Sequence, residues 1–325
     1  MSRSIVKNVI LGLAVGDALG VPVEFKSRDD LKVRPIQTMK GNGTYHKERG
    51  TWSDDTSLTL AGLESLTFGL DFNDVMERYK NWYVNGDYTP DGETFDIGNT
   101  TKNAITKYLH QVPPLQCGDS DEMSNGNGSL MRISPFVLYL YFHNYHLDEF
   151  DYRGYEIIHK ASSLTHSHPR CLLECGIYAK VLTALLNPLS GNKAAIVQKA
   201  IDAALYSYDE SMFSSGIKAE ISTYEHLVDV LNFSKMSEET IHSTGYIVDT
   251  LEAALYCFLN TDSYKDCVLK AVNLGYDTDT TASVAGSLAG AFYGVETIPQ
   301  EWLNTLVKKE YIISLCNGFE ERNSH

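Results

Sequence analysis

Two clusters of acidic and hydroxyl residues are the side chains best suited to chemistry. Residues 53–56 (Ser-Asp-Asp-Thr) lie in GTWSDDTSLTLAGL, and residues 277–280 (Asp-Thr-Asp-Thr) lie in LGYDTDTTASVAGSLAG, far along the chain. Each cluster opens a segment of apolar and small residues, which is typical of a core element. Buried unpaired carboxylates are very costly, whereas hard divalent ions such as Mg²⁺ and Mn²⁺ favour oxygen ligands. We therefore predict a two-metal site assembled from both clusters.

A capped helix is the alternative interpretation of each cluster. Ser53 suits the N-cap of a helix that begins at Asp54, and acids in a first turn favour the helix dipole. Capping explains one acid in each cluster, but neighbouring acids such as Asp54 and Asp55 point in different directions. A calcium loop is excluded, because position five after Asp277 is Thr281 and position twelve is Leu288 instead of glutamate.

Two glycine-containing segments could approach a ligand with their backbone. Residues 96–101 (DIGNTT) and residues 124–129 (SNGNGS) each precede a predicted helix. Glycine permits close approach, and free N–H groups at a helix start suit phosphate, although a plain turn with a helix cap is the alternative for each segment. Neither segment matches a Walker A loop or a GxGxxG fingerprint, which argues against nucleoside-triphosphatase and dinucleotide-oxidoreductase functions.

His166 and Glu24 are further candidates for the site. His166 lies in THSHP, and the cysteines that follow it raise a zinc alternative, but the paired C-x₂-C spacing is absent. Cys171 and Cys175 also share a predicted helix face with apolar residues, where buried free cysteine is ordinary. We therefore interpret His166 as a substrate-pocket residue. Glu24 follows the first helix among apolar neighbours, which predicts a perturbed acidity, whereas a solvent-exposed glutamate is the alternative.

The elements that position these residues have helical spacing. Ile5, Val9, Leu13 and Asp17 follow i, i+4 steps, so Asp17 continues a buried stripe. Alternating strand patterns are scarce, and the predicted fold class is all-α. Beyond the helices at the chain start and after the first acidic cluster, we predict helices at 99–110, 132–144, 170–186, 194–207, 220–232, 245–259, 263–273 and 280–293.

Small residues recur every four positions in the first and last of the predicted core helices. Gly12, Gly16 and Gly20 form one ridge, and the second consists of Ala282, Gly286, Gly290 and Gly294. Such ridges permit close backbone approach despite a cost of about 1 kcal/mol of helix propensity per glycine. We predict tightly packed central helices, and the alternative is that these glycines mark helix breaks.

Composition bounds the class of protein and its partners. With 43% hydrophobic and 21% charged residues the chain is predicted to be globular, and the two acidic clusters need each other, which favours a single domain over residues 1–325. The net charge of -15 argues against general binding to a nucleic-acid backbone. Six scattered cysteines suggest no disulfide framework and favour a cytoplasmic location.

The first residues only partly resemble a signal peptide. Arg3 and Lys7 precede a short apolar run that contains Gly12 and ends close to Asp17. No uninterrupted apolar stretch approaches the roughly 20 residues of a membrane span. We expect neither a cleaved signal nor a membrane partner.

Taken together, these segments resemble the ADP-ribosylglycohydrolase family, which includes the dinitrogenase reductase-activating glycohydrolases. The matching pieces are GLAVGDALGVPVEF, GTWSDDTSLTL, FDIGNTT, GNGSLMR, THSHP and GYDTDTTASVAGSLAGAFYG, in family order across positions 12 to 294. Each piece alone is weak, whereas the ordered set is specific. One departure is Tyr276, where many members have a second glycine, which is expected to narrow the rim of the site without removing a ligand.

The resemblance implies a compact, single-domain orthogonal helical bundle with two Mg²⁺ or Mn²⁺ ions. The implied metal ligands are Ser53, Asp54, Asp55, Asp277, Asp279 and Thr280. The implied diphosphate- and ribose-binding residues are Gly98, Asn99, Thr100, Ser124, Asn125, Gly126, Asn127, Gly128 and Ser129, with His166 nearby. Glu24 matches an acidic position with a catalytic part in some members, and Asp55 or Glu24 would relay a proton.

The expected reaction is hydrolysis of the bond between the distal ribose C1″ of ADP-ribose and an acceptor such as a protein arginine or serine. The expected partners are ADP-ribose or an ADP-ribosylated protein, and we expect a monomer. Alternatives on the same scaffold are a non-catalytic ADP-ribose-binding or structural protein and an immunity protein that neutralises an ADP-ribosylating toxin. A different metal-dependent hydrolase of small nucleotide derivatives is a third. The complete set of oxygen donors argues against a non-catalytic descendant, which would have no reason to keep all six.

Overall fold

The computed structural model describes residues 4–143, 151–186, 192–210 and 213–324, and these residues confirm the all-α prediction. Short 3₁₀ turns join the α-helices, and the described residues contain isolated β-bridges but no β-strand. The helices are α1 (Ile5–Gly20), α2 (Arg28–Val33), α3 (Asp54–Leu66), α4 (Phe72–Asn85), α5 (Asn99–Leu109), α6 (Ser134–Phe142), α7 (Tyr152–Ser163), α8 (Pro169–Leu186), α9 (Lys193–Glu210), α10 (Ser215–Ala219), α11 (Val230–Ser234), α12 (Ile247–Leu259), α13 (Tyr264–Asn273), α14 (Thr278–Tyr293), α15 (Gln300–Thr305) and α16 (Lys309–Asn323).

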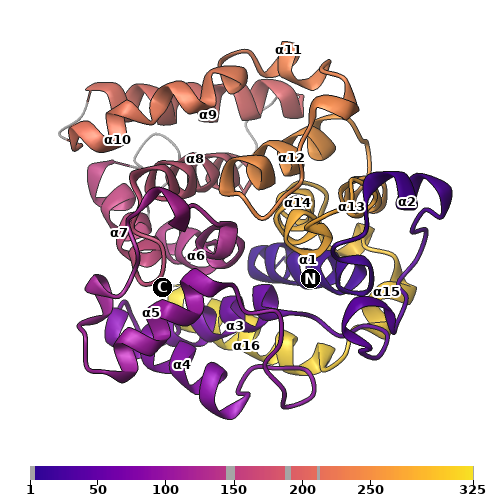
Figure 1. Cartoon of the computed structure of the whole chain (residues 1–325), viewed down its shortest axis with the longest axis horizontal. Helices are drawn as coiled ribbons and strands as arrows, with labels where there is room; N and C mark the ends of the chain where they lie inside the picture. Colours follow the sequence, from indigo (N-terminus) through magenta and orange to yellow (C-terminus); the bar gives the residue numbers. More distant parts are fainter. Residues whose placement is uncertain (1–3, 144–150, 187–191, 211–212, 325) are drawn as a thin grey trace.

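Helices α1 and α14 lie side by side at the centre of the fold (Figure 1). Their small-residue ridges face each other, which confirms the predicted tight packing of central helices, except that Gly294 ends α14 with a φ of 92°. A methyl group placed on Gly12 would lie 2.4 Å from the carbonyl oxygen of Gly286, and one on Gly16 would lie 2.1 Å from that of Ala282. Only glycine permits this approach, so the two ridges fix how far α14 slides along α1.

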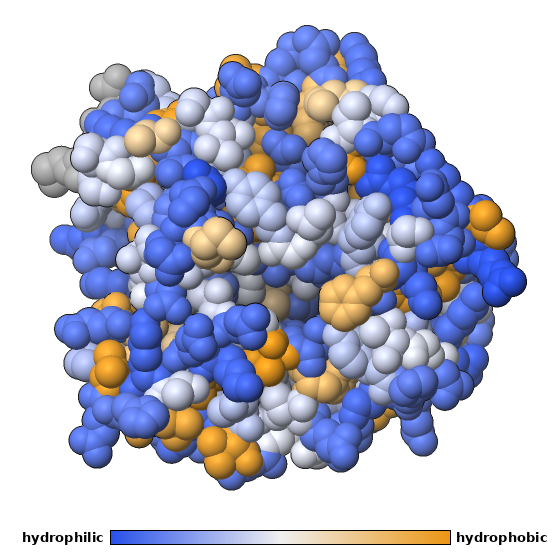
Figure 2. All heavy atoms as spheres, in the orientation of Figure 1, coloured by the Kyte–Doolittle hydropathy of each residue, from blue (hydrophilic) through white to orange (hydrophobic). Residues whose placement is uncertain are grey.

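The remaining helices surround this central pair. In Figure 1, α3, α4, α5 and α16 lie below it, whereas α8, α9, α11 and α12 lie above it. The buried apolar side chains of all these helices join one core. Figure 2 shows that hydrophilic residues cover most of the visible face, which is hollowed near its centre.

Several predicted helices differ from those observed. The predicted helix at 220–232 is wrong: a 3₁₀ turn, Ile221–Val228, contains Tyr224 outside the helical region, and α11 follows it. The prediction for 132–144 ends outside the described residues, and the observed helix is Ser134–Phe142. Helices α4, α7 and α16 were missed because their sequences are largely polar, although the buried residues of α16 follow helical spacing at Ile312, Cys316 and Phe319.

The N-terminal segment corrects another expectation. Residues 5–23 form the one helical stretch, among the described residues, that is long and apolar enough to cross a membrane by length and composition. Within the fold, 89% of its most apolar part is buried, because α1 packs against α14 and α16. The length and apolar composition are therefore those of a core helix of a folded domain.

We predict that Gly12→Ala lowers the free energy of unfolding by about 1 to 3 kcal/mol, because the added methyl group meets the backbone of α14 and forces the helices apart. Gly318→Ala is the matched control, since Gly318 lies inside α16 and its methyl group would meet nothing within 4 Å. That control should be neutral or stabilising by up to about 1 kcal/mol. Urea unfolding measures both, and equal effects would contradict the ridge packing.

Candidate metal centre and cavity

The two acidic clusters meet at the N-termini of α3 and α14. Asp54 and Asp55 occupy the first turn of α3, whereas Asp277 caps α14 and Asp279 lies in its first turn. The hydroxyl group of Thr280 donates to Oδ1 of Asp55 at 3.2 Å, which joins the clusters directly. Two segments more than half the chain apart therefore build one site.

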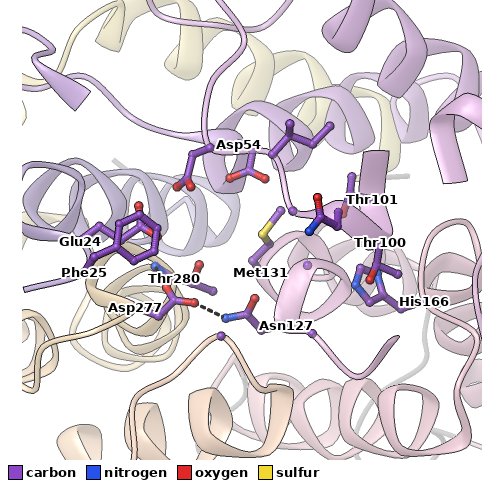
Figure 3. A pocket seen from close by; sticks show the side chains of 17 residues that line it. Glu24, Phe25, Asp54, Thr100, Thr101, Asn127, Met131, His166, Asp277 and Thr280 are labelled. Atoms are coloured by element: carbon purple, nitrogen blue, oxygen red, sulfur yellow. Dashed lines mark hydrogen bonds between the residues drawn. The ribbon is translucent and has the colours of Figure 1, made fainter. Parts of the chain in front are cut away.

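Glu24 joins this acidic group from a third segment. It directly follows the 3₁₀ turn Val21–Val23 at the end of α1. Glu24, Asp277 and Asp279 each offer a carboxylate oxygen, and these oxygens all lie within 4.8 Å of one another. Figure 3 shows Glu24 and Asp277 near Asp54 and Thr280. This arrangement of hard oxygen donors fits a divalent cation.

Several of these carboxylate oxygens lack partners. Oδ2 of Asp55 and both side-chain oxygens of Asp279 are buried and accept no hydrogen bond from the described residues. Burial and neighbouring carboxylates raise the pKa of both groups well above the usual value. Because unpaired buried carboxylates are costly, the donor set fits a cation better than a purely structural role.

Ser53 shows that helix capping and the acidic cluster occur together. Its hydroxyl oxygen accepts a hydrogen bond from the backbone N–H of Asp55 at 3.4 Å, as the capping interpretation predicts. The second acid in the same turn is not needed for that cap. A role of Ser53 as a metal ligand stays a prediction.

Asp17 positions the first acidic cluster from α1. Its carboxylate accepts from the backbone N–H groups of Ser53 and Thr56 at 2.9 and 3.1 Å and from the hydroxyl group of Thr56 at 2.6 Å. Burial raises the pKa of Asp17 to about 7 against the opposing effect of these hydrogen bonds. Asp17 thus fixes the start of α3 through a contact that α3 itself cannot provide.

Glu24 shares a proton with two neighbours. The hydroxyl oxygen of Tyr45 lies 2.6 Å from Oε2 of Glu24 and 2.5 Å from Oδ1 of Asp96. A tyrosine carries one hydroxyl hydrogen, so it donates to only one carboxylate at a time, and the second contact requires a proton on a carboxyl group. Burial and the charge of Asp96 raise the pKa of Glu24 to about 10, and burial also raises the pKa of Asp96, so this pair of carboxyl groups retains a proton at neutral pH.

A cavity of about 340 Å³ opens beside the acidic group. The predicted loops provide part of its wall, together with Phe25, Asp96 and Met131. The predicted substrate-binding residues on that wall are Gly98, Asn99, Thr100, Gly126, Asn127, Gly128 and His166. The side-chain amide of Asn127 donates to Oδ2 of Asp277 at 2.8 Å, which connects the loop wall to the acids (Figure 3).

The other predicted binding residues, Ser124, Asn125 and Ser129, lie behind the wall instead of on it. Ser124 donates to Asp121 at 2.8 Å, and the backbone carbonyl of Asn125 accepts from Ile247 at 3.0 Å. Ser129 is fully buried and accepts from Ser162 at 3.0 Å. These residues support the loop, because their side chains hydrogen-bond to neighbouring residues instead of lining the cavity.

The zinc alternative at the cysteines finds no support in the described part of the chain. No histidine–cysteine group there brings three ligand atoms close enough to share an ion. The thiol of Cys171 donates to Oδ1 of Asn125 at 3.4 Å, and burial raises the pKa of both Cys171 and Cys175. Both residues are buried thiols of a helix face, as expected.

A family model described as ADP-ribosylglycohydrolase matches residues 2–325. The chain belongs to the ADP-ribosylglycohydrolase family. The ADP-ribosylarginine hydrolase Tri1 of Serratia proteamaculans is 33% identical over 312 residues, covering 95% of this chain and 77% of that protein. The ADP-ribosyl-dinitrogen reductase glycohydrolase of Rhodospirillum rubrum is 31% identical over 306 residues, covering 92% and 89%.

A solved structure of an ADP-ribosylglycohydrolase-related protein complex superimposes with a TM-score of 0.75 at 29% identity and covers 98% of each chain. The family resemblance of the sequence motifs is therefore confirmed. Because the family and its named relatives are glycohydrolases, the chain is an enzyme of that class, an ADP-ribosylglycohydrolase.

Sequence reasoning missed three side chains around the acids. Asp17 was recognised as part of a buried stripe but received no role at the site. Asp96 is the second residue of the segment FDIGNTT, and its acidic side chain was the signal that could have identified it. Tyr45 lies in a turn-rich segment without periodicity, so only the fold brings it between Glu24 and Asp96.

The raised pKa values predict how metal and pH affect stability. A carboxyl group whose pKa is higher in the folded state binds its proton more tightly there, so stability falls as pH rises from the unfolded value of 3.8 through the folded value, about 7 for Asp17. Without metal, the melting temperature should fall between about pH 5 and about pH 8, and Mg²⁺ should raise it more at the higher pH.

Matched variants test this assignment. Asp279→Asn should remove most of the Mg²⁺-induced rise in melting temperature, because Asp279 contributes two of the unpaired oxygens. Asp262→Asn makes the same change at a fully exposed position, so it should leave that rise intact. Equal Mg²⁺ effects in the two variants would show that the ion binds elsewhere.

Proposed function

We propose that this enzyme is a divalent-metal-dependent hydrolase that releases ADP-ribose from ADP-ribosylated arginine in a protein. The observation that carries the proposal is the group of unpaired buried carboxylate oxygens beside a cavity lined by glycine-containing loops. This proposal deepens the family assignment, because it adds the metal requirement and the acceptor. Water is added across the glycosidic bond as it is cleaved, and the products are free ADP-ribose and the unmodified acceptor.

The proposed ligands of two Mg²⁺ or Mn²⁺ ions are Ser53, Asp54, Asp55, Asp277, Asp279 and Thr280. Such ions, when bound, supply Lewis-acid stabilisation and a lower pKa for nearby water. Asp54, Asp277 and Thr280 line the cavity, so their side chains are placed to orient a ribose there. Asp55 is fully buried behind them, which suits a supporting ligand better than contact with substrate.

Glu24 is the proposed proton carrier. It lines the cavity together with Asp96, and the hydroxyl group of Tyr45 lies within hydrogen-bond distance of both carboxyl groups. A carboxyl group with a raised pKa keeps a proton at neutral pH and can deliver it to a leaving group. Binding of cations nearby would lower that pKa, which couples proton release to the loaded site.

The rim of the cavity suits an arginine acceptor. Phe25, which lines the cavity, is 67% exposed, and Tyr276, which precedes the lining residue Asp277, is 48% exposed. The backbone N–H of Phe25 donates to the Tyr276 carbonyl at 2.7 Å, which holds the two residues together. Aromatic faces next to acidic groups attract a planar guanidinium cation. The relative from Serratia proteamaculans, which is named an ADP-ribosylarginine hydrolase, supports the same acceptor.

We further propose that the enzyme acts as a monomer in the cytoplasm. All six cysteines are free and buried, which suits a reducing compartment. Both proposals can be checked by light scattering and by fractionation.

The direct test is release of ADP-ribose from arginine-ADP-ribosylated protein, with Mg²⁺ and with EDTA, and with serine-ADP-ribosylated protein as the comparison substrate. We expect release from the arginine conjugate that EDTA abolishes and added Mg²⁺ restores. Metal-independent release would contradict the proposed centre, and faster release from the serine conjugate would contradict the acceptor.

Two variants separate the metal site from proton transfer. Asp279→Asn should lower kcat by several orders of magnitude, because a lost cation removes Lewis-acid assistance. Glu24→Gln should lower kcat by roughly 10²- to 10⁴-fold through loss of general acid–base catalysis, yet keep the Mg²⁺-induced rise in melting temperature. If Glu24→Gln also loses that rise, then Glu24 is a metal ligand instead of the proton carrier.

A further inference from the structure

A buried cation stands behind the cavity wall. The guanidinium of Arg132 is fully buried, and it donates to the Tyr79 hydroxyl at 3.0 Å, the Ala161 carbonyl at 3.2 Å and the Thr165 hydroxyl oxygen at 2.6 Å. Its Nε–H has no partner, and no carboxylate of the described residues forms an ion pair with it. Burying a cation without a counter-ion costs free energy, and an anion bound nearby would offset part of that cost.

The contact between Arg132 and Thr165 determines what Thr165 offers to His166. Oγ1 of Thr165 lies 2.7 Å from Nδ1 of His166. Because arginine only donates, Thr165 accepts from Arg132, and its single hydroxyl hydrogen is free to point at Nδ1. The opposite arrangement would leave that buried hydroxyl hydrogen without an acceptor among the described residues, at a cost of about 1 to 3 kcal/mol.

His166 is therefore held as a neutral ring with its hydrogen on Nε2. Burial and the positive charge of Arg132 lower the pKa of His166 to about 3, so the ring carries one hydrogen. Nδ1 accepts from Thr165, and the hydrogen is consequently on Nε2. The hydrogen-bond chain fixes both the tautomer and the orientation of the ring.

The Nε2 edge of the ring faces the glycine loop at the cavity. A methyl group on Gly126 would lie 3.6 Å from Nε2 of His166, and one on Gly128 would lie 2.9 Å from Cε1. Figure 3 shows His166 on the side of the cavity away from Glu24 and Asp277, beside Thr100. An anion here would be separated from the carboxylates and close to the buried cation.

We propose that Arg132 and Thr165 are positioning residues that hold His166 as an Nε2–H donor to the diphosphate of the bound ADP-ribosyl group. Arg132 supplies positive charge from behind the wall, and Thr165 transmits its orientation to the ring. The inference rests on the proposed function, because it assumes that ADP-ribose occupies this cavity. Neither positioning residue touches the reacting ribose.

Nitrogen NMR of the ¹⁵N-histidine-labelled enzyme tests the tautomer without any ligand. We expect His166 to show an unprotonated Nδ1 and a protonated Nε2. Thr165→Val should shift the Nδ1 resonance because the hydroxyl donor is gone, whereas Thr165→Ser, which keeps a hydroxyl group, should preserve it. A protonated Nδ1 in the wild-type enzyme would overturn the proposal.

Calorimetric binding of ADP-ribose to the Mg²⁺-loaded enzyme tests the ligand. Thr165→Val should weaken binding by roughly three- to tenfold, the value of one neutral hydrogen bond, and Thr165→Ser should stay near the wild type. Arg132→Met should also weaken ADP-ribose binding. The double variant should lose less binding free energy than the sum of the two single losses, because the two residues act through the same hydrogen-bond chain. Adenosine, which lacks the diphosphate, should bind the wild type and all four variants alike.

Kinetics separate positioning from general damage. With arginine-ADP-ribosylated protein, Thr165→Val should raise KM and leave kcat unchanged, because the diphosphate contact is the same in the ground and transition states. Equal losses for adenosine and ADP-ribose, or wild-type affinity in Thr165→Val, would overturn the role of the chain of hydrogen bonds. Failure of the proposed function is distinct, since the wild-type enzyme would then release no ADP-ribose.

Discussion

Mutual repulsion among buried carboxylates is the constraint on which the site depends. The groups come from the end of α1, the start of α3, the loop before α5 and the start of α14, and burial raises the pKa of each: Asp17, Glu24, Asp54, Asp55, Asp96, Asp277 and Asp279. No lysine or arginine of the described residues forms an ion pair with them. Protons or cations must balance this charge, and the unpaired oxygens of Asp279 favour cations.

The scaffold can hold such a cluster because its supporting helices are placed with little freedom. The small-residue contact between α1 and α14 sets the position of the α14 N-terminus relative to α1. Asp17, on the last turn of α1, then fixes the start of α3 through its hydrogen bonds to Ser53 and Thr56. One helix thus positions both acidic clusters, which links core packing to the geometry of the site.

Much of the fold could be predicted from periodicity, and much of the site from chemistry. The glycine ridges predicted tight packing of the central helices, and the cost of burying unpaired carboxylates predicted that the two acidic clusters lie together. The turn-rich segment around Tyr45 offered no periodic signal, so its place between Glu24 and Asp96 comes from tertiary packing alone. The family resemblance implied ligand binding by Ser124 and Ser129, but the hydroxyl group of Ser124 donates to Asp121 and that of Ser129 accepts from Ser162, and sequence composition does not encode such side-chain directions.

The cavity is electrically divided. Carboxylates gather at one end, and at the other end the neutral ring of His166 lines the wall, with Thr165 and the buried Arg132 behind it. An ADP-ribosyl group has matching parts, with an anionic diphosphate and a ribose whose hydroxyl groups bind cations. With the proposed substrate, this division would favour one orientation, because the reversed pose would place the diphosphate against the acids.

Anomalous diffraction from crystals soaked in Mn²⁺ would locate the metal ions themselves. We expect two strong peaks between the N-termini of α3 and α14, within ligand distance of Asp54, Asp55, Asp277 and Asp279. Their absence in crystals that bind Mn²⁺ elsewhere, or in crystals that bind none, would contradict a metal centre built from the two acidic clusters.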